Sequence, residues 1–128
     1  MVLLLGIPMV EDTQQPDYTT EIKKLLRLTV DQEASDLHLA VDEPVAIRID
    51  GKIRKAQHKP LSKKTVEDLI YSMLTEEQIA ILETKKELDC AIEFGDIGRF
   101  RVNVGYEERG LYATLRYIKD TIPEIAQL

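Results

Sequence analysis

Four arginines in one short segment are the residues best suited to bind a ligand. The segment Gly98–Arg116 reads GRFRVNVGYEERGLYATLR, and all four of its basic residues are arginine, although lysine is common elsewhere in the chain. A guanidinium group can bind two phosphate oxygens at once, which favours arginine over lysine for this task. Arg99 and Arg101 alternate with Phe100, so both point to one face of a predicted strand. The pattern predicts an anion site, with phosphate as the anion that fits best.

A second strand, Leu111–Arg116, follows this one and brings Arg116 to the same face. A loop over Gly105–Gly110 gives every apolar residue an apolar partner, and it places arginine opposite arginine, which is unfavourable unless an anion offsets the charge. In the alternative interpretation, solvent screens the charge, or Asp96 or Glu93 reaches over. The expected pairs are Val104–Leu111, Val102–Ala113, Phe100–Leu115, Asn103–Tyr112, Arg101–Thr114 and Arg99–Arg116.

The rest of the chain predicts the elements that hold these strands. Helical periodicity begins near Thr20, with Thr19 or Thr20 as the cap, and again after Ser62 and Thr75. The Ser62 helix carries an apolar stripe that extends to Met73 and Leu74. Extended segments lie between and after these helices, in the order α, β-β-β, α-α, β-β-β. This order predicts an α+β domain whose antiparallel sheet carries helices on one face.

The best hairpin signal is PVAIRIDGKIRK, with Asp50-Gly51 at its turn. A two-residue turn would place Ile49 opposite Lys52. A three-residue loop with a left-handed Gly51 would place Ile47 opposite Ile53 instead, and the better apolar match favours this longer loop.

Composition narrows the class of partner. The chain has 128 residues, a net charge of −6 and a pI near 5.0, which favours one soluble domain and argues against nucleic acid or an anionic membrane as the main partner. Its one cysteine, Cys90, excludes an internal disulfide and is expected to be a small buried hydrophobe. The apolar start, MVLLLGIPMV, is shorter than a typical signal peptide or a membrane span.

Four motifs together resemble a known family. They are ASDLHL (34–39), IRIDGKIRK (47–55), RFRVN (99–103) and RGLYATLR (109–116). In this order and spacing they look like the N-terminal domain of the PilT-type pilus-retraction (twitching motility) ATPases, whose relatives include pilus-assembly and type II secretion ATPases. The resemblance implies an extension or linker over 1–19, a PAS-like domain over 20–121, and the start of a linker to a RecA-like ATPase domain over 122–128.

The resemblance also implies a function for the arginines. Family members form hexameric rings at the cytoplasmic side of the inner membrane, where they work on the pilus platform protein. The N-terminal domain of one subunit packs against the ATPase domain of another, so that its arginines approach the phosphates of ATP bound with magnesium. The residues implied here for phosphate contact in trans are Arg99, Arg101, Arg116 and Arg109, and those implied for the domain interface are Asp36, His38 and Asn103.

The sequence departs from the complete family pattern. It contains no G-x-x-x-x-G-K-[ST] loop and no assignable magnesium ligand, so this chain alone is expected not to hydrolyse ATP and to have no bound cofactor. Asp36 and His38, even with His58 or Cys90 added, lack the spacing of a metal site, and no metal is expected. The alternative function is a stand-alone PAS-like adaptor or sensor. The reading frame after Leu128 distinguishes the two hypotheses.

Overall fold

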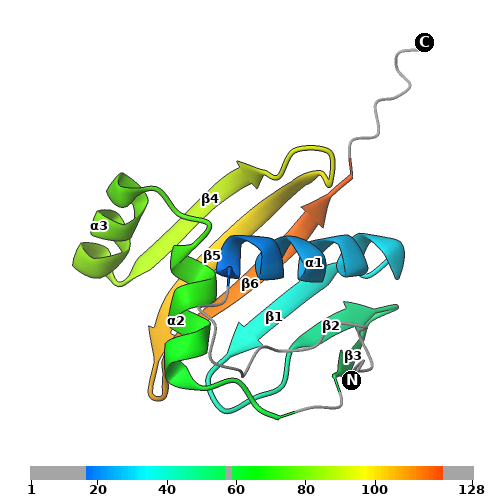
Figure 1. Cartoon of the computed structure of the whole chain (residues 1–128), viewed down its shortest axis with the longest axis horizontal. Coiled ribbons are helices and arrows are strands. Elements are labelled where there is room, and N and C mark those ends of the chain that lie inside the picture. Colours follow the sequence, from blue (N-terminus) through cyan, green and yellow to red (C-terminus); the bar gives the residue numbers. More distant parts are fainter. Residues whose placement is uncertain (1–16, 57–58, 120–128) are drawn as a thin grey trace.

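The computed structural model describes residues 17–56 and 59–119, which fold around one six-stranded antiparallel sheet. The strand order is β3-β2-β1-β6-β5-β4, so the two halves of the chain meet where β1 pairs with β6 (Figure 1). The strands are β1 (Asp36–Ala40), β2 (Ala46–Ile49), β3 (Lys52–Lys55), β4 (Glu87–Glu93), β5 (Arg99–Glu107) and β6 (Gly110–Ile118).

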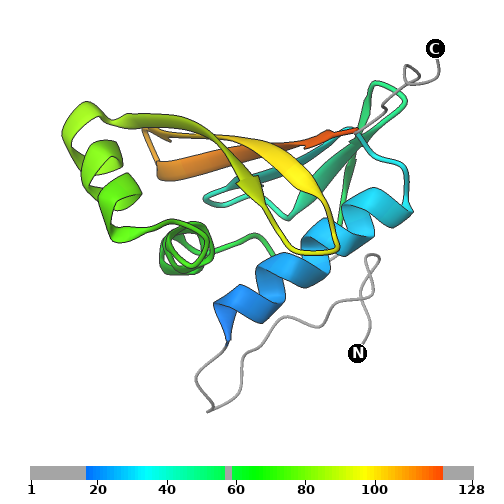
Figure 2. The same cartoon turned by 90° about the horizontal axis from the view of Figure 1, so that it is seen from above.

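Two helices cover one face of this sheet. Figure 2 shows α1 (Tyr18–Asp31) and α2 (Lys63–Tyr71) on the same side, while α3 (Glu76–Lys85) lies at the end of the sheet beside β4. The predicted α+β architecture, an antiparallel sheet with helices on one face, is confirmed. The other face is not covered by any helix within residues 17–56 and 59–119.

The period-two pattern of the central strands builds the core. Phe100, Val102 and Val104 of β5 are fully buried under the helices, and the next residues along the strand point to the open face. The partners of these side chains come from the other strands and from α1 and α2; they are Leu37, Leu39, Leu111, Leu115, Ile22, Leu26, Val66, Leu69 and Ile70. The core therefore fixes which side chains of β1, β5 and β6 face outward.

The expected register of β5 and β6 is wrong by two residues. The strands are joined by a two-residue turn at Glu108-Arg109, and Arg101, not Arg99, lies opposite Arg116. Gly105 stays in β5, where it pairs with Tyr112. A shift of two residues leaves each side chain on its face and still pairs apolar with apolar residues, so the pattern could not distinguish the two registers.

The β2–β3 hairpin has the two-residue turn, so the expected longer loop is wrong. Ile49 lies opposite Lys52, and both Asp50 (φ 51°) and Gly51 (φ 79°) are left-handed, as a type I′ turn requires. Apolar matching misled the prediction because β3 is an exposed edge strand, whose side chains have no core to match.

Two helix boundaries also differ from expectation. Asp17, not Thr19 or Thr20, caps α1, and its carboxylate accepts hydrogen bonds from the backbone and hydroxyl of Thr20. The second helix ends at Tyr71, before the half-buried Met73 and Leu74. The cap of α3 is as predicted, with reciprocal hydrogen bonds between Thr75 and Gln78. The predicted segments before residue 17 and from 122 to 128 lie outside the described residues.

Candidate functional site

Three arginines and one aspartate form a row across the open face of the sheet. Register pairs join Arg48 to Asp36, Asp36 to Arg116, and Arg116 to Arg101, on four neighbouring strands. The row lies directly above the buried core, because Arg101 and Arg116 alternate with buried residues of β5 and β6. The sheet thus brings together residues up to 80 positions apart in the sequence.

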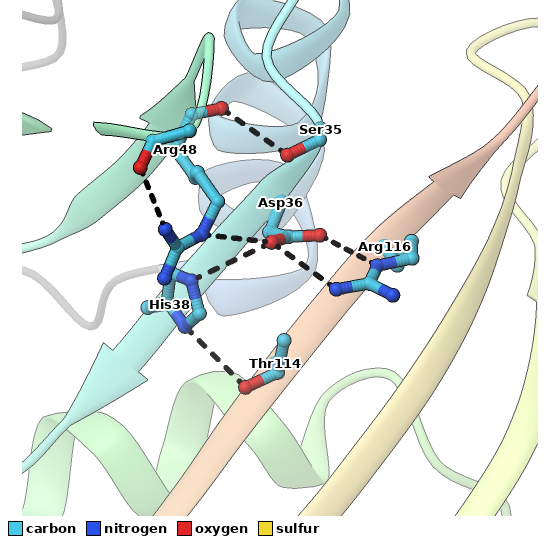
Figure 3. A network of polar contacts seen from close by, with 7 residues as sticks. Ser35, Asp36, His38, Arg48, Thr114 and Arg116 are labelled. Atoms are coloured by element: carbon cyan, nitrogen blue, oxygen red, sulfur yellow. Dashed lines mark hydrogen bonds and ion pairs between the residues drawn. The ribbon is translucent and has the colours of Figure 1, made fainter. Parts of the chain in front are cut away.

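Asp36 is the centre of this row (Figure 3). Its side chain is only 1% exposed, and Oδ1 accepts a hydrogen bond of 2.8 Å from Nε of Arg116. Nε of Arg48 lies 3.4 Å from Oδ2, on the other side of the carboxylate. Arg48 is itself held by a 2.9 Å hydrogen bond from Nη1 to the carbonyl of Gly51 in the hairpin turn. A buried carboxylate requires such compensation, and here two neighbouring strands supply it.

Arg101 has a separate partner. Its Nε and Nη2 donate hydrogen bonds of 3.2 and 3.1 Å to Asp89 on β4. These hydrogen bonds raise the pKa of Arg101, and the hydrogen bond to Asp36 likewise raises the pKa of Arg116. The positive charge of Arg101 lowers the pKa of Arg116 and so offsets part of this increase. The two guanidinium groups are therefore held by different carboxylates, that of Arg116 by Asp36 on β1 and that of Arg101 by Asp89 on β4.

Acidic residues of the protein itself supply negative charge to the arginine face, and they are other acids than those expected. Asp89 and Asp36 supply the negative charge. Asp96 instead pairs with Arg27 on α1, at 3.3 Å. Positive charge still exceeds negative charge in this group, since the three arginines of the row share Asp36 and the neighbouring Asp89. The side chains of Arg101 and Arg116 remain about two-thirds exposed, at 67% and 66%.

His38, Thr114 and Asn103 form the next row of the same face. Nδ1 of His38 lies 3.4 Å from the hydroxyl of Thr114, and its Nε2 lies 3.8 Å from Oδ2 of Asp36 without a hydrogen bond. Burial lowers the pKa of His38, and Asp36 offsets part of this effect. His38 is therefore a neutral polar neighbour of the arginine row near pH 7.

The structure gathers six of the seven predicted site residues on one face and separates the seventh. Arg99 continues the β5 side of that face, opposite Ile118. Arg109 lies in the β5–β6 turn, at the other end of the strands, where it pairs with Glu43 and Glu107 at 3.2 and 3.0 Å. The six residues brought together are Arg99, Arg101, Arg116, Asp36, His38 and Asn103.

Sequence reasoning missed Arg48 and Asp89. Each stands on a strand whose parity places it on the open face, so the alternation in IRID and ELDC was a usable signal. To identify Arg48 and Asp89 from this signal, one also needs the order of the strands in the sheet, which the sequence patterns did not provide. No cluster of three possible metal ligands occurs among the described residues. Cys90 is half-buried, and burial raises its pKa.

Comparison with known proteins shows the family to which this chain is related. No protein-family model matches the chain. The type IV pilus retraction ATPase PilT of Pseudomonas aeruginosa is 36% identical over 108 residues, which cover 84% of this chain and 31% of PilT. This chain is a homologue of the N-terminal domain of the type II/IV secretion ATPases.

Further relatives agree with this assignment. The type IV pilus ATPase PilU of P. aeruginosa is 31% identical over 84% of the chain and 28% of its own length. The crystal structure of the pilus retraction motor PilT with bound ADP superposes with a TM-score of 0.72 and 31% identity, over 89% of this chain and 32% of that protein. The Legionella pneumophila ATPase DotB gives 0.71 and 25%, over 91% and 33%. This secretion-ATPase domain thus spans about a third of the relatives that it matches.

Proposed function

We propose that this domain is the N-terminal part of a hexameric ATPase that retracts type IV pili, and that its open sheet face completes the nucleotide site of a neighbouring subunit. In this function Arg99, Arg101 and Arg116 contact the phosphates in trans. Asp36, His38 and Asn103 surround them at the domain interface. Arg109 is assigned a weaker role, since two glutamates hold it at the far end of the strands.

The observation that carries the proposal is the row of outward-facing arginines on the sheet face that helices leave uncovered. Among residues 17–56 and 59–119, helices cover only the other face, which leaves the arginine face as the surface for a second domain. Arg101 and Arg116 are register partners on β5 and β6, so their guanidinium groups could bind oxygens of one phosphate group together if both turned from their carboxylates. A fixed positive charge of this kind acts by offsetting phosphate charge while the nucleotide reacts.

Each arginine can exchange its carboxylate partner for a phosphate. Asp89 and Arg101 are both solvent-exposed, and exposed ion pairs hold their partners weakly. An incoming phosphate therefore competes readily for Arg101. Asp36 is buried, yet it keeps Arg48 when Arg116 turns toward a ligand. Coupling of nucleotide state to domain motion would then follow from which partner the arginines hold.

The other components of the proposed motor are inferred from the family resemblance alone. They are ATP and magnesium in the full-length protein, a RecA-like ATPase domain, neighbouring ring subunits, the inner-membrane platform protein, and a place at the cytoplasmic side of that membrane. No helix among the described residues is long and apolar enough to cross a bilayer.

The gene provides the first test. A reading frame that continues beyond Leu128 into a phosphate-binding loop is expected, whereas a stop codon directly after Leu128 would exclude the motor. The second test replaces Arg101 and Arg116, singly, by glutamine in the full-length gene product. Each change is expected to lower ATP turnover about a hundredfold, as the removal of one preorganised charge donor does elsewhere.

The matched control is Arg27→Gln. Arg27 is also an exposed arginine paired with an exposed aspartate, but it lies on α1 at the covered side of the sheet. Its replacement is expected to leave turnover and ring assembly unchanged. Wild-type turnover in both sheet-face variants would remove these arginines from the mechanism.

A further inference from the structure

An aromatic side chain, Tyr112, also lies on the arginine face, and the proposed phosphate site gives it no role. Tyr112 belongs to β6 and shares the open face with Thr114 and Arg116, because alternate residues point the same way. It pairs across the strands with Gly105, and its ring lies over that glycine. A Cβ atom built on Gly105 would lie 2.6 Å from the Tyr112 hydroxyl oxygen and 2.8 Å from Cζ.

The glycine lets the ring lie down against the sheet. With any larger residue at position 105 the ring would have to move, because the added Cβ would occupy the same space. Tyr112 is half-buried, so part of the ring remains in contact with solvent on the open face. An aromatic ring held in this way is a surface on which a planar heterocycle can stack.

The order of chemical groups along β5 and β6 then matches that of a nucleotide. Tyr112 with Gly105 comes first, Thr114 with Asn103 second, and Arg116 with Arg101 third. Arg116 lies four positions after Tyr112 in the strand, which corresponds to about 13 Å along the sheet. This span is comparable with the length of an extended nucleoside diphosphate. The middle row offers a hydroxyl and an amide, which suit the hydroxyl groups of a sugar.

We propose that a nucleoside diphosphate or triphosphate lies lengthwise on β5 and β6, with its base on Tyr112 and its phosphates on Arg101 and Arg116. The proposal rests on the proposed function, which assigns the phosphates to the arginines, and it adds the base contact and the direction of the ligand. The base points toward the β5–β6 turn. Thr114 and Asn103 face the sugar.

A purely structural role for Tyr112 makes a different prediction. If the ring only covers Gly105, its replacement changes stability and leaves ligand preference untouched. If the ring stacks on the base, its replacement removes the advantage of a nucleotide over the bare phosphate chain. Binding of ADP relative to pyrophosphate therefore separates the two roles.

The experiment titrates the 128-residue chain with ADP and, separately, with pyrophosphate, up to millimolar concentrations, and follows backbone amide shifts by NMR. The wild-type chain is expected to bind ADP about tenfold more tightly than pyrophosphate, since stacking of one base on an aromatic ring contributes about this factor. Saturation of the Tyr112 ring protons is expected to transfer to the protons of the adenine.

Three variants complete the design. Tyr112→Leu is expected to bind ADP and pyrophosphate equally, and Tyr112→Phe to keep the wild-type preference. Tyr106→Leu is the matched control, because Tyr106 is an exposed tyrosine one residue from Gly105 whose side chain points to the opposite face. It is expected to keep the preference as well. Urea unfolding confirms that each variant is folded under the titration conditions.

The outcomes distinguish this inference from the function on which it rests. If Tyr112→Leu keeps the tenfold preference, or the wild-type chain has none while pyrophosphate still shifts the amides of Arg101 and Arg116, the base contact is wrong and the phosphate role stands. If neither ligand shifts those amides at millimolar concentration, the phosphate role of the arginine face fails, and the base contact fails with it.

Discussion

The ion pair between Asp36 and Arg116 is expected to stabilise the domain far more than the pair between Asp89 and Arg101. The two pairs have similar geometry, with shortest contacts of 2.8 and 3.1 Å, but they differ in burial. The Asp36 carboxylate is 1% exposed, whereas both side chains of the other pair are open to solvent. Water therefore screens the second pair and replaces its hydrogen bonds at little cost.

The magnitude follows from what each substitution leaves behind. Asp36→Asn keeps one acceptor but removes the charge that Arg48 and Arg116 share, and the loss of a hydrogen bond to a charged group costs about 2 kcal/mol. Arg116→Gln leaves Asp36 with Arg48 as its counter-ion, so its cost should be smaller, about 1 kcal/mol. The coupling energy of this pair is expected to be about 1 kcal/mol.

Two double-mutant cycles measure the difference. Urea unfolding of the wild type, Asp36→Asn, Arg116→Gln and the double variant gives the first coupling energy, and the same set for Asp89 and Arg101 gives the matched control. The second coupling is expected to be indistinguishable from zero. Equal couplings for the two pairs, or no coupling at Asp36, would refute the reasoning that burial decides which arginine is held firmly.

Three further predictions concern stability. Gly98→Ala should destabilise the fold by about 2 kcal/mol, because Gly98 has φ +134° and its Cβ would lie 2.8 Å from the ring of Tyr117, whereas Gly95→Ala, with φ +58° and open space, should cost less in the same urea assay. Glu21→Gln should stabilise the domain at pH 7 by about 1 kcal/mol, because burial raises the pKa of Glu21 and its Oε1 has no hydrogen bond. A carboxyl group with a raised pKa lowers the stability of the fold as the pH rises through its folded pKa, so the advantage of the variant should shrink as the pH falls to 4. His38→Gln should remove a loss of stability that the wild type shows as the pH falls below about 6.5, because the unfolded chain binds a proton there more readily than the half-buried imidazole does. Urea unfolding midpoints of the two proteins at pH 7 and pH 5.5 test this, and an equal change of both midpoints with pH would contradict it.

The sequence predicted faces well and registers poorly, for one physical reason. Alternation in RFRVNV tells which side chains share a face, because the period of a strand is two residues. Sliding one strand by two residues preserves every face, so the pattern contains no information on that slip. In β5 the register depends on whether Gly105 ends the strand or continues it, and the ring of Tyr112 over that glycine is a tertiary contact.

Strand order was the larger gap. Hairpins are local, so the β2–β3 and β5–β6 hairpins were found from turn residues and alternation. The pairing of β1 with β6 joins segments about 75 residues apart, and without it Asp36 could be assigned to the interface but not to Arg116. Arg48 was missed for the same reason, since its importance comes only from the neighbour that β1 provides. The family resemblance supplied this long-range information for some residues and not for others.

If the arginines bind phosphate as proposed, the two carboxylates also set the order in which they turn to it. Asp89 is exposed and loses little when Arg101 leaves it, so Arg101 can turn first. When Arg101 has turned to a negatively charged ligand, that ligand lies beside Arg116. Asp36, the partner of Arg116, still has Arg48 as a counter-ion, and a hydrogen bond to the carbonyl of Gly51 holds Arg48 in place. Arg48 thereby lowers the cost of releasing Arg116, although it stays with Asp36 itself. Substitution of Arg48 should for this reason weaken phosphate binding by Arg116 even though Arg48 makes no contact with the ligand.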